Sequence, residues 1–298
     1  MMIPARLLLL DGGFGTQVQE FGYSGCPDEL CLSHPEVVAQ IHQRYLEAGA
    51  DLIETNSFGA SSINLEGFGL ADKSYEIAYA AAKIASQQAK AFTNQNQDKP
   101  RYVVGSMGPT SKSATLAPLM DDPITPEDFQ KAYYLQAKGL IEGGADILMI
   151  ETVIDSLNAK MAIAAIRILE AEKAIEIPIM LSMSMSDSFG RLLSGESIEE
   201  FYAQISNEKL FSIGLNCSLG AEQMLPFLRN LSKIATTRVS AHPNAGMPDM
   251  YGKYSQSPED FAVKVKQFVD ENLASIVGGC CGTTPEHIKE LAAALKLS

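Results

Sequence analysis

The sequence predicts a single (β/α)8 barrel, the TIM-barrel fold, over residues 1–298. Eight short apolar runs recur along the chain, and a segment with helical spacing of apolar residues follows each of them. Glycine, proline and capping residues mark the junctions between runs and helical segments. The length also fits, because about 250 residues is usual for this barrel and longer examples are common.

The eight apolar runs predict the strands. None of them alternates cleanly between apolar and polar residues, and such continuous runs are typical of parallel strands covered on both faces. The predicted strands are residues 7–11, 51–56, 102–108, 146–152, 177–185, 211–218, 238–244 and 275–279.

The segments between the runs predict the helices, because they carry apolar residues at spacings of three and four. Three of them start with a hydroxyl residue, a proline and an acid, at Thr125, Ser257 and Thr284. Glycine follows the last turn after Glu47 and Glu142. The predicted helices are residues 37–47, 75–92, 127–142, 157–172, 198–206, 222–234, 259–271 and 286–295.

A doubly wound open sheet is the alternative fold. That fold needs a glycine-rich fingerprint opening its first helix, and the glycines at 12–15 do not have the required spacing. The long stretch 110–123 is expected to cover the mouth of the barrel.

Composition and net charge limit the partners and the cell compartment that we expect for this protein. Apolar residues make up 46% and charged residues 20%, so a large core can form. A net charge of −13 makes nucleic acid and anionic membranes poor partners. The apolar stretch at residues 7–10 is too short for a signal peptide, and no apolar run approaches the roughly 20 residues of a membrane span, so we expect neither. We therefore expect a cytoplasmic protein whose five cysteines stay reduced and serve metal binding or catalysis.

Polar residues gather where the predicted strands end, which is where such barrels carry their chemistry. For the threonines and serines in this set, helix capping or loop hydrogen bonding is an equally good interpretation. The residues are Asp11, Glu54, Thr55, Asn56, Ser106, Glu151, Thr152, Ser184, Asn216, Cys217, His242, Asn244, Cys280 and Cys281.

Three cysteines at the ends of two strands predict a zinc site. Cys280 and Cys281 can reach one ion only if the backbone leaves β geometry, and the flanking glycines allow this. Together with Cys217 they offer three thiolates at about 2.3 Å and one open position, as in catalytic zinc sites. A vicinal disulfide or inert core thiols are the alternatives. Cys26 and Cys31 are spaced poorly for a zinc site and are interpreted as incidental.

The charge of such a site indicates its chemistry. Three thiolates give zinc a net charge of −1, which keeps a bound thiolate nucleophilic, so the natural substrate is a thiol that accepts an alkyl group. Asp11 and Glu151 could hold an ammonium group, and the amides of residues 13–16 could form a nest for a carboxylate. A thiol with both groups is an amino-acid thiol.

Six segments carry a family resemblance that extends from about residue 7 to 295. The chain resembles the homocysteine-binding, zinc-dependent methyltransferase family, and most of all the N-terminal homocysteine module of cobalamin-dependent methionine synthase. The segments are LLLLDGGFGT, EAGADLIETNSFGA, GLIEGGADILMIET, IGLNCSLGAE, HPNAGMP and IVGGCCGTTPEHI.

The resemblance implies the roles of particular residues. It implies a zinc ion bound by Cys217, Cys280 and Cys281, with the sulfur of homocysteine completing the coordination. It implies that Asp11 and Glu151 lie near the substrate amine. Gly15 and Thr16 would contact the substrate carboxylate, and Asn244 would lie beside the zinc and fill the open position when substrate is absent.

The resemblance also implies the reaction: methyl transfer to homocysteine, giving methionine, with methylcobalamin on a partner protein or module as donor. The folate and cobalamin modules of the full synthase are not found here, so we expect a free-standing subunit or an excised module. S-methylmethionine and betaine are alternative donors, because relatives that use them share the cysteines. Two other classes stay open: a phosphate-binding barrel lyase, with its anion at residues 279–283, and a non-catalytic zinc or corrinoid-docking module.

Overall fold

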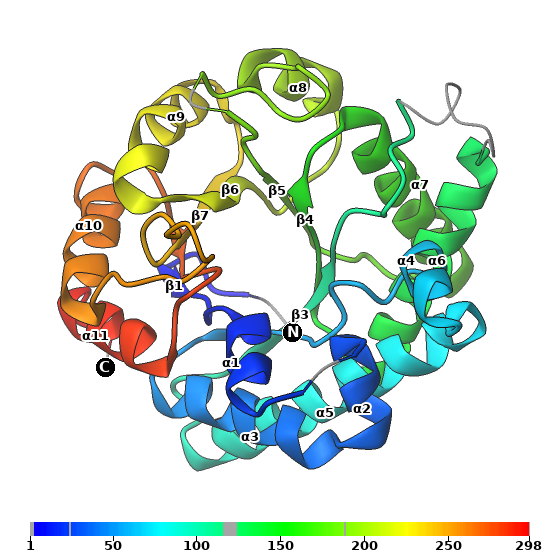
Figure 1. Cartoon of the computed structure of the whole chain (residues 1–298), viewed down its shortest axis with the longest axis horizontal. Coiled ribbons are helices and arrows are strands. Elements are labelled where there is room, and N and C mark those ends of the chain that lie inside the picture. The colour runs from blue at the N-terminus through cyan, green and yellow to red at the C-terminus, as the bar shows by residue number, and fades with distance from the viewer. Residues whose placement is uncertain (1–2, 24, 116–123, 188, 298) are drawn as a thin grey trace.

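The computed structural model describes residues 3–23, 25–115, 124–187 and 189–297. Within them, eight parallel strands form one sheet in the order β1-β8-β7-β6-β5-β4-β3-β2. A parallel bridge between Leu10 and Leu52 joins the two ends of this sheet, so the strands close into a barrel. Figure 1 shows the strands at the centre with the helices around them. The predicted single (β/α)8 barrel is confirmed.

The strands are shorter at the closure than elsewhere in the barrel. β1 and β8 have two residues each, whereas β6 has nine. The glycines that follow β8 end its pairing early, which accounts for the difference from the predicted 275–279. The strands are β1 (Leu8–Leu9), β2 (Leu52–Glu54), β3 (Tyr102–Met107), β4 (Ile147–Val153), β5 (Ile179–Met183), β6 (Ser212–Gly220), β7 (Arg238–Asn244) and β8 (Ile276–Val277).

Helices of eight or more residues follow each strand, as the sequence predicts. They are α3 (Pro35–Glu47), α5 (Ser74–Gln95), α6 (Pro126–Gly143), α7 (Ser156–Lys173), α8 (Ile198–Ile205), α9 (Ala221–Ile234), α10 (Pro258–Asp270) and α11 (Pro285–Ala294). Shorter elements lie between them: α1 (Phe14–Glu20), η1 (Pro27–Glu29), α2 (Leu30–Ser33), α4 (Ser62–Leu65), η2 (Glu66–Phe68) and η3 (Ala71–Lys73).

The three helices whose starts the sequence motifs predict begin at those motifs. Thr125 and Ser257 accept hydrogen bonds from backbone N–H groups in the first turns of α6 and α10, and proline occupies the first helical position in α6, α10 and α11. Gly144 ends α6 in the left-handed conformation, which glycine adopts without strain. Local capping chemistry therefore fixes these boundaries.

The barrel interior and the sheet–helix interface are separate apolar clusters. Leu8, Leu10 and Met149 belong to the cluster inside the barrel, whereas Leu9 and Leu148 pack outward against the helices. Both faces of the strands are thus buried, and this explains why the apolar runs do not alternate. The apolar filling of the interior leaves the carboxyl ends of the strands for polar residues.

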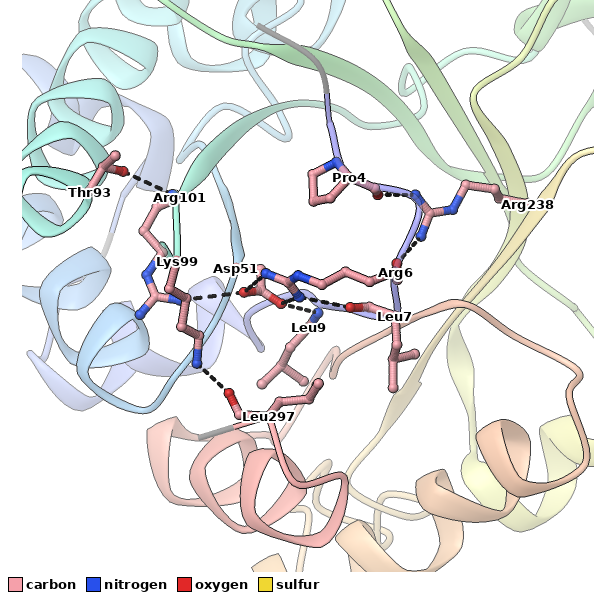
Figure 2. Close-up of polar contacts among 10 residues, drawn as sticks. All are labelled: Pro4, Arg6, Leu7, Leu9, Asp51, Thr93, Lys99, Arg101, Arg238 and Leu297. Atoms are coloured by element: carbon pink, nitrogen blue, oxygen red, sulfur yellow. Dashed lines mark hydrogen bonds and ion pairs between the residues drawn. The ribbon is translucent and has the colours of Figure 1, made fainter. Parts of the chain in front are cut away.

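The amino-terminal end of the barrel is held by an ion cluster around Asp51 (Figure 2). Arg6 contacts both carboxylate oxygens of Asp51 at 2.9 and 2.8 Å, and Arg101 approaches from the other side at 3.5 Å. The backbone N–H of Leu9 also donates to Asp51, at 3.0 Å. Arg238 donates to the carbonyls of Pro4 and Arg6. These contacts stabilise the seam where the short strand β1 meets β2.

The stretch predicted to cover the mouth of the barrel, residues 110–123, lies partly outside the described residues, at 116–123. Its described part packs against the start of α7, where Ala114 N–H donates to Asn158 and Thr115 donates to Asp155.

None of the helices in the described part of the chain is long and apolar enough to cross a membrane.

Candidate active site

Three thiols meet at the carboxyl end of the barrel. The sulfur atoms of Cys217, Cys280 and Cys281 all lie within 4.8 Å of one another, and Cys217 and Cys281 are 3.6 Å apart. Tetrahedral zinc with bonds of about 2.3 Å requires sulfur atoms about 3.8 Å apart. The three thiols are free, so the vicinal disulfide is not formed. The donor set and its spacing therefore fit zinc.

Two departures from strand geometry bring these thiols together. β6 has a register shift between Asn216 and Gly220, and within it Cys217 and Ser218 adopt positive φ angles of 58° and 57°. This conformation is uncommon outside glycine and turns the Cys217 side chain out of the regular pleat. β8 ends at Val277, so Cys280 and Cys281 lie in the loop that leads to α11.

The pKa values of Cys280 and Cys281 are shifted in opposite directions. Hydrogen bonds from Cys217, Cys280 and Tyr254 hold the pKa of Cys281 well below its usual range, at about 3. Contact with the other two sulfurs, together with burial, raises the pKa of Cys280. One thiolate is thus favoured in the metal-free protein, and a cation is needed to ionise all three.

Asn244 contacts this cluster through the backbone of Cys281. Its side-chain oxygen accepts a hydrogen bond from the backbone N–H of Cys281 at 3.1 Å, and its amide nitrogen is 3.5 Å from the hydroxyl of Tyr254. Tyr254 comes from the loop between β7 and α10, and it was not among the candidates from the sequence. The neighbouring sequence did not indicate a role for Tyr254 in the site, because only the fold brings this loop to Cys281.

Three carboxyl groups lie close together at the same end of the barrel. Asp11 is 1% exposed, and one of its side-chain oxygens has no hydrogen-bond partner. Burial raises the pKa of Asp11 and of Glu54 well above the usual range, and the charge of Glu151 adds to both shifts. Burial raises the pKa of Glu151 to about 7. None of the ion pairs among the described residues includes Asp11, Glu54 or Glu151, so the group is suited to an external ammonium.

Glu151 is oriented by neighbours from two other strands. Ser106 of β3 donates to one of its oxygens, and the side-chain amide of Asn216 donates to the other at 3.2 Å. The same Asn216 amide donates to Thr152 Oγ1 at 2.9 Å, and its oxygen accepts from Thr152 N–H at 3.0 Å. Asn216, the residue before the predicted metal ligand Cys217, therefore contacts the predicted substrate ligand Glu151 directly.

Gly15 and Thr16 form part of the first turn of α1, which the sequence did not predict. The helix is short, has a glycine inside and has no side-chain cap, so it lacks the usual starting signals. A Cβ atom on Gly15 would meet nothing within 4 Å, so there is open space beside it. The predicted nest at 13–16 is smaller than expected, because Gly13 N–H already donates to Thr283 Oγ1 at 2.9 Å.

The loop proposed for phosphate in the alternative lyase has no free amides. The N–H groups of residues 279–283 donate in turn to Asp11 O, Pro243 O, Asn244 Oδ1, Thr16 Oγ1 and Cys280 O. Phosphate sites of this kind need N–H groups that point at the ligand. The hydrogen-bond geometry therefore opposes the phosphate interpretation.

The remaining strand-end residues and the two other cysteines contact the rest of the protein and lie outside the three-thiol cluster. Thr55 accepts from Ser106 N–H, and Ser184 contacts Ser218 at 2.5 Å. His242 is buried, and burial lowers its pKa to about 3, so it is neutral at physiological pH. Cys26 and Cys31 are buried in the core, apart from the three-thiol cluster.

The chain is similar to a known protein family and to solved structures. A sequence profile of the homocysteine S-methyltransferase family matches residues 8–295. The metallated form of the homocysteine methyltransferase MmuM from Escherichia coli is similar, with a TM-score of 0.78 and 23% identity over 97% of this chain and 96% of that one. Its apo form has a TM-score of 0.74, with the same identity and coverage. At this identity the structures show a shared fold.

The family match covers nearly the whole chain, including both segments that carry the three thiols. It agrees with the resemblance seen in the motifs, and it favours a transferase over a lyase or a non-catalytic module. The chain belongs to the homocysteine S-methyltransferase family, whose members transfer a methyl group to homocysteine.

Proposed function

We propose that this enzyme is zinc-dependent, with Cys217, Cys280 and Cys281 as metal ligands and the sulfur of homocysteine in the fourth position. The three sulfurs within 4.8 Å of one another are the observation that carries the proposal. A zinc ion bound there would keep the substrate thiol ionised at neutral pH, against a pKa of about 8.5 for a free thiol.

Asp11, Glu54 and Glu151 would hold the ammonium group of homocysteine. The oxygen of Asp11 that lacks a partner supports this role, because a buried acceptor is costly unless it is paired. An ammonium group offers three donors, and its charge would lower the pKa values that burial has raised. Gly15 and Thr16 would receive the carboxylate, and the open space beside Gly15 supports that placement.

The methyl donor would be a methyl-corrinoid carried by a partner protein or module. Large exposed apolar side chains on two loops at the mouth support a docking partner, because such residues often mark interaction surfaces. Phe189 and Leu193 lie between β5 and α8, and Met247, Met250 and Tyr251 lie between β7 and α10. We call these five residues the mouth rim.

A second kind of donor is favoured by the three carboxyls. A site rich in buried acids would also attract a small cationic donor, such as the sulfonium S-methylmethionine or the quaternary ammonium betaine. Methionine formation from homocysteine should therefore be compared with methylcobalamin, S-methylmethionine and betaine. Activity with a small cation alone would replace the corrinoid proposal.

The metal proposal is tested by Cys217→Ala. The variant should bind much less zinc and lose methyl transfer while its circular dichroism spectrum stays that of the wild type. Cys31→Ala is the matched control, because it removes a buried thiol outside the cluster and should keep the metal. A Cys217→Ala protein with full activity and no metal would refute the zinc site.

A further inference from the structure

Two loops from opposite ends of the sequence are tied together at the mouth of the barrel. Residues 11–16 follow β1, and residues 279–283 follow β8. Hydrogen bonds run in both directions between them: Gly279 N–H to Asp11 O at 3.0 Å, Gly13 N–H to Thr283 Oγ1 at 2.9 Å, and Gly282 N–H to Thr16 Oγ1 at 2.9 Å. The first loop carries the proposed amino-acid contacts, and the second carries two proposed metal ligands.

Thr283 is at the centre of this junction. Its side chain is fully buried, and its hydroxyl accepts from Gly13 N–H and donates to Cys280 O at 2.7 Å. The hydroxyl therefore bridges the backbone of the first loop to the backbone of a proposed metal ligand. The hydroxyl of Tyr45 in α3 also contacts both loops, because it donates to Gly13 O and Thr283 O at 3.3 Å each.

The two loops are also in close steric contact. A Cβ atom on Gly13 would lie 2.5 Å from Cys280 O, and one on Gly12 would lie 2.6 Å from Thr283 Oγ1. Neither loop can therefore shift toward the other, and the Thr283 hydroxyl joins the Gly279–Asp11 and Gly282–Thr16 hydrogen bonds in holding them at this separation. A change in one loop is transmitted to the other through this contact.

We infer that Thr283 is a positioning residue that makes metal binding and amino-acid binding interdependent. This inference rests on the proposed function. Fixing Cys280 in the loop fixes Thr283 and, through its hydroxyl, Gly13 and the first turn of α1. Metal binding would then order the amino-acid site before the substrate arrives, and linkage requires the amino acid to tighten metal binding by the same factor.

The test uses an amino acid without sulfur, so that the probe cannot coordinate the metal. L-2-aminobutyrate is titrated into metal-free and zinc-loaded protein, and the ratio of the two dissociation constants measures the coupling. We expect a ratio of about five or more in the wild type. Thr283→Ser, which keeps the hydroxyl, should retain this ratio. Thr283→Val, which has nearly the same shape without it, should lower the ratio toward one.

Thr93→Val is a matched control. The Thr93 hydroxyl also accepts from a backbone N–H, of Arg101, and donates to a backbone carbonyl, of Ala89, both at 2.9 Å, but at the other end of the barrel. Its loss should leave the coupling ratio unchanged even where thermal stability falls. A purely structural role for Thr283 would give the same pattern, with reduced stability and an unchanged ratio, and would overturn the inference.

Failure of the inference and failure of the proposed function can be told apart. A wild-type protein that binds zinc and methylates homocysteine, but shows the same ratio as Thr283→Val, refutes only the coupling. A wild-type protein that binds no zinc refutes the proposed function itself. If Thr283→Val does not fold, Tyr45→Phe decides: a ratio below that of the wild type supports the inference, and an unchanged ratio overturns it.

Discussion

Asn216 donates a hydrogen bond from its side-chain amide to Glu151 at 3.2 Å, across the barrel from β6 to β4. These strands are not neighbours in the sheet, because β5 lies between them. The residue that precedes Cys217 thus orients a carboxyl proposed to bind the substrate amine. Alternate strands of a barrel share the same interior layer, which explains how two distant segments meet here.

Replacing Asn216 tests this connection. Asn216→Ala removes the donor to Glu151 and leaves Thr152 N–H without its acceptor, which costs about 1–3 kcal/mol in a buried place. We expect the KM for homocysteine to rise by about tenfold or more, with zinc content unchanged. Steady-state kinetics together with metal analysis would check this. An unchanged KM would mean that Glu151 does not need this partner.

Glu151 should make the stability of the metal-free protein depend on pH. Burial raises its pKa from 4.5 to about 7, so the folded protein holds this proton more tightly than the unfolded chain does. Its contribution is complete below about pH 4.5 and is lost as the pH rises to about 7. Glu151→Gln cannot ionise, so its stability relative to the wild type should increase between pH 5 and pH 8, by up to about 3 kcal/mol.

Urea unfolding of both proteins at the two pH values measures this difference. The loss of hydrogen-bond quality in the glutamine variant affects both pH values alike and cancels in the comparison. A constant difference between variant and wild type would show that Glu151 titrates normally.

The ion cluster at the amino-terminal end predicts a stability effect without a catalytic one. Asp51→Asn removes the fully buried carboxylate that faces Arg6 and Arg101. Because the Arg101 side chain is only 9% exposed, breaking its buried pair with Asp51 costs about 3 kcal/mol or more. We expect a lower free energy of unfolding, with an unchanged kcat/KM for the folded enzyme. Glu271→Gln, which breaks an exposed pair with Arg229, is the control and should change stability little.

The mouth rim predicts a selective effect on the donor. Met250→Glu places a charge on a side chain that is 87% exposed, and it should raise the KM for a protein-bound methyl-corrinoid by about tenfold. Free methylcobalamin should be used as before. Val263→Glu changes an exposed apolar residue of α10 outside the rim and should affect neither donor. Equal loss with both donors would place the effect in the active site instead of the docking surface.

The barrel could be predicted from the sequence because its strands and helix starts are marked by residues that are close together in the chain. Continuous apolar runs report strands buried on both faces, and motifs such as Thr125-Pro126 report helix starts. The meeting of Cys217 with Cys280 and Cys281 was also predictable, because the carboxyl ends of parallel strands meet at one end of a barrel.

Other features of the site depend on contacts between distant segments. The positive φ angle of Cys217 has no signal in its neighbours, since only the register shift in β6 requires it. The roles of Glu54, Asn216 and Tyr254 depend on which strands and loops face one another across the mouth. Helix α1 was missed because Gly15 weakens its helical pattern and Gly13 offers no side-chain cap.

X-ray absorption at the zinc edge tests the central claim most directly. The zinc-loaded protein should show three sulfur ligands and one oxygen or nitrogen ligand, and addition of homocysteine should change this to four sulfurs. The same four-sulfur spectrum should not form with L-2-aminobutyrate, which has no thiol. A protein that holds no zinc, or whose zinc keeps the same ligands when homocysteine binds, would contradict the account.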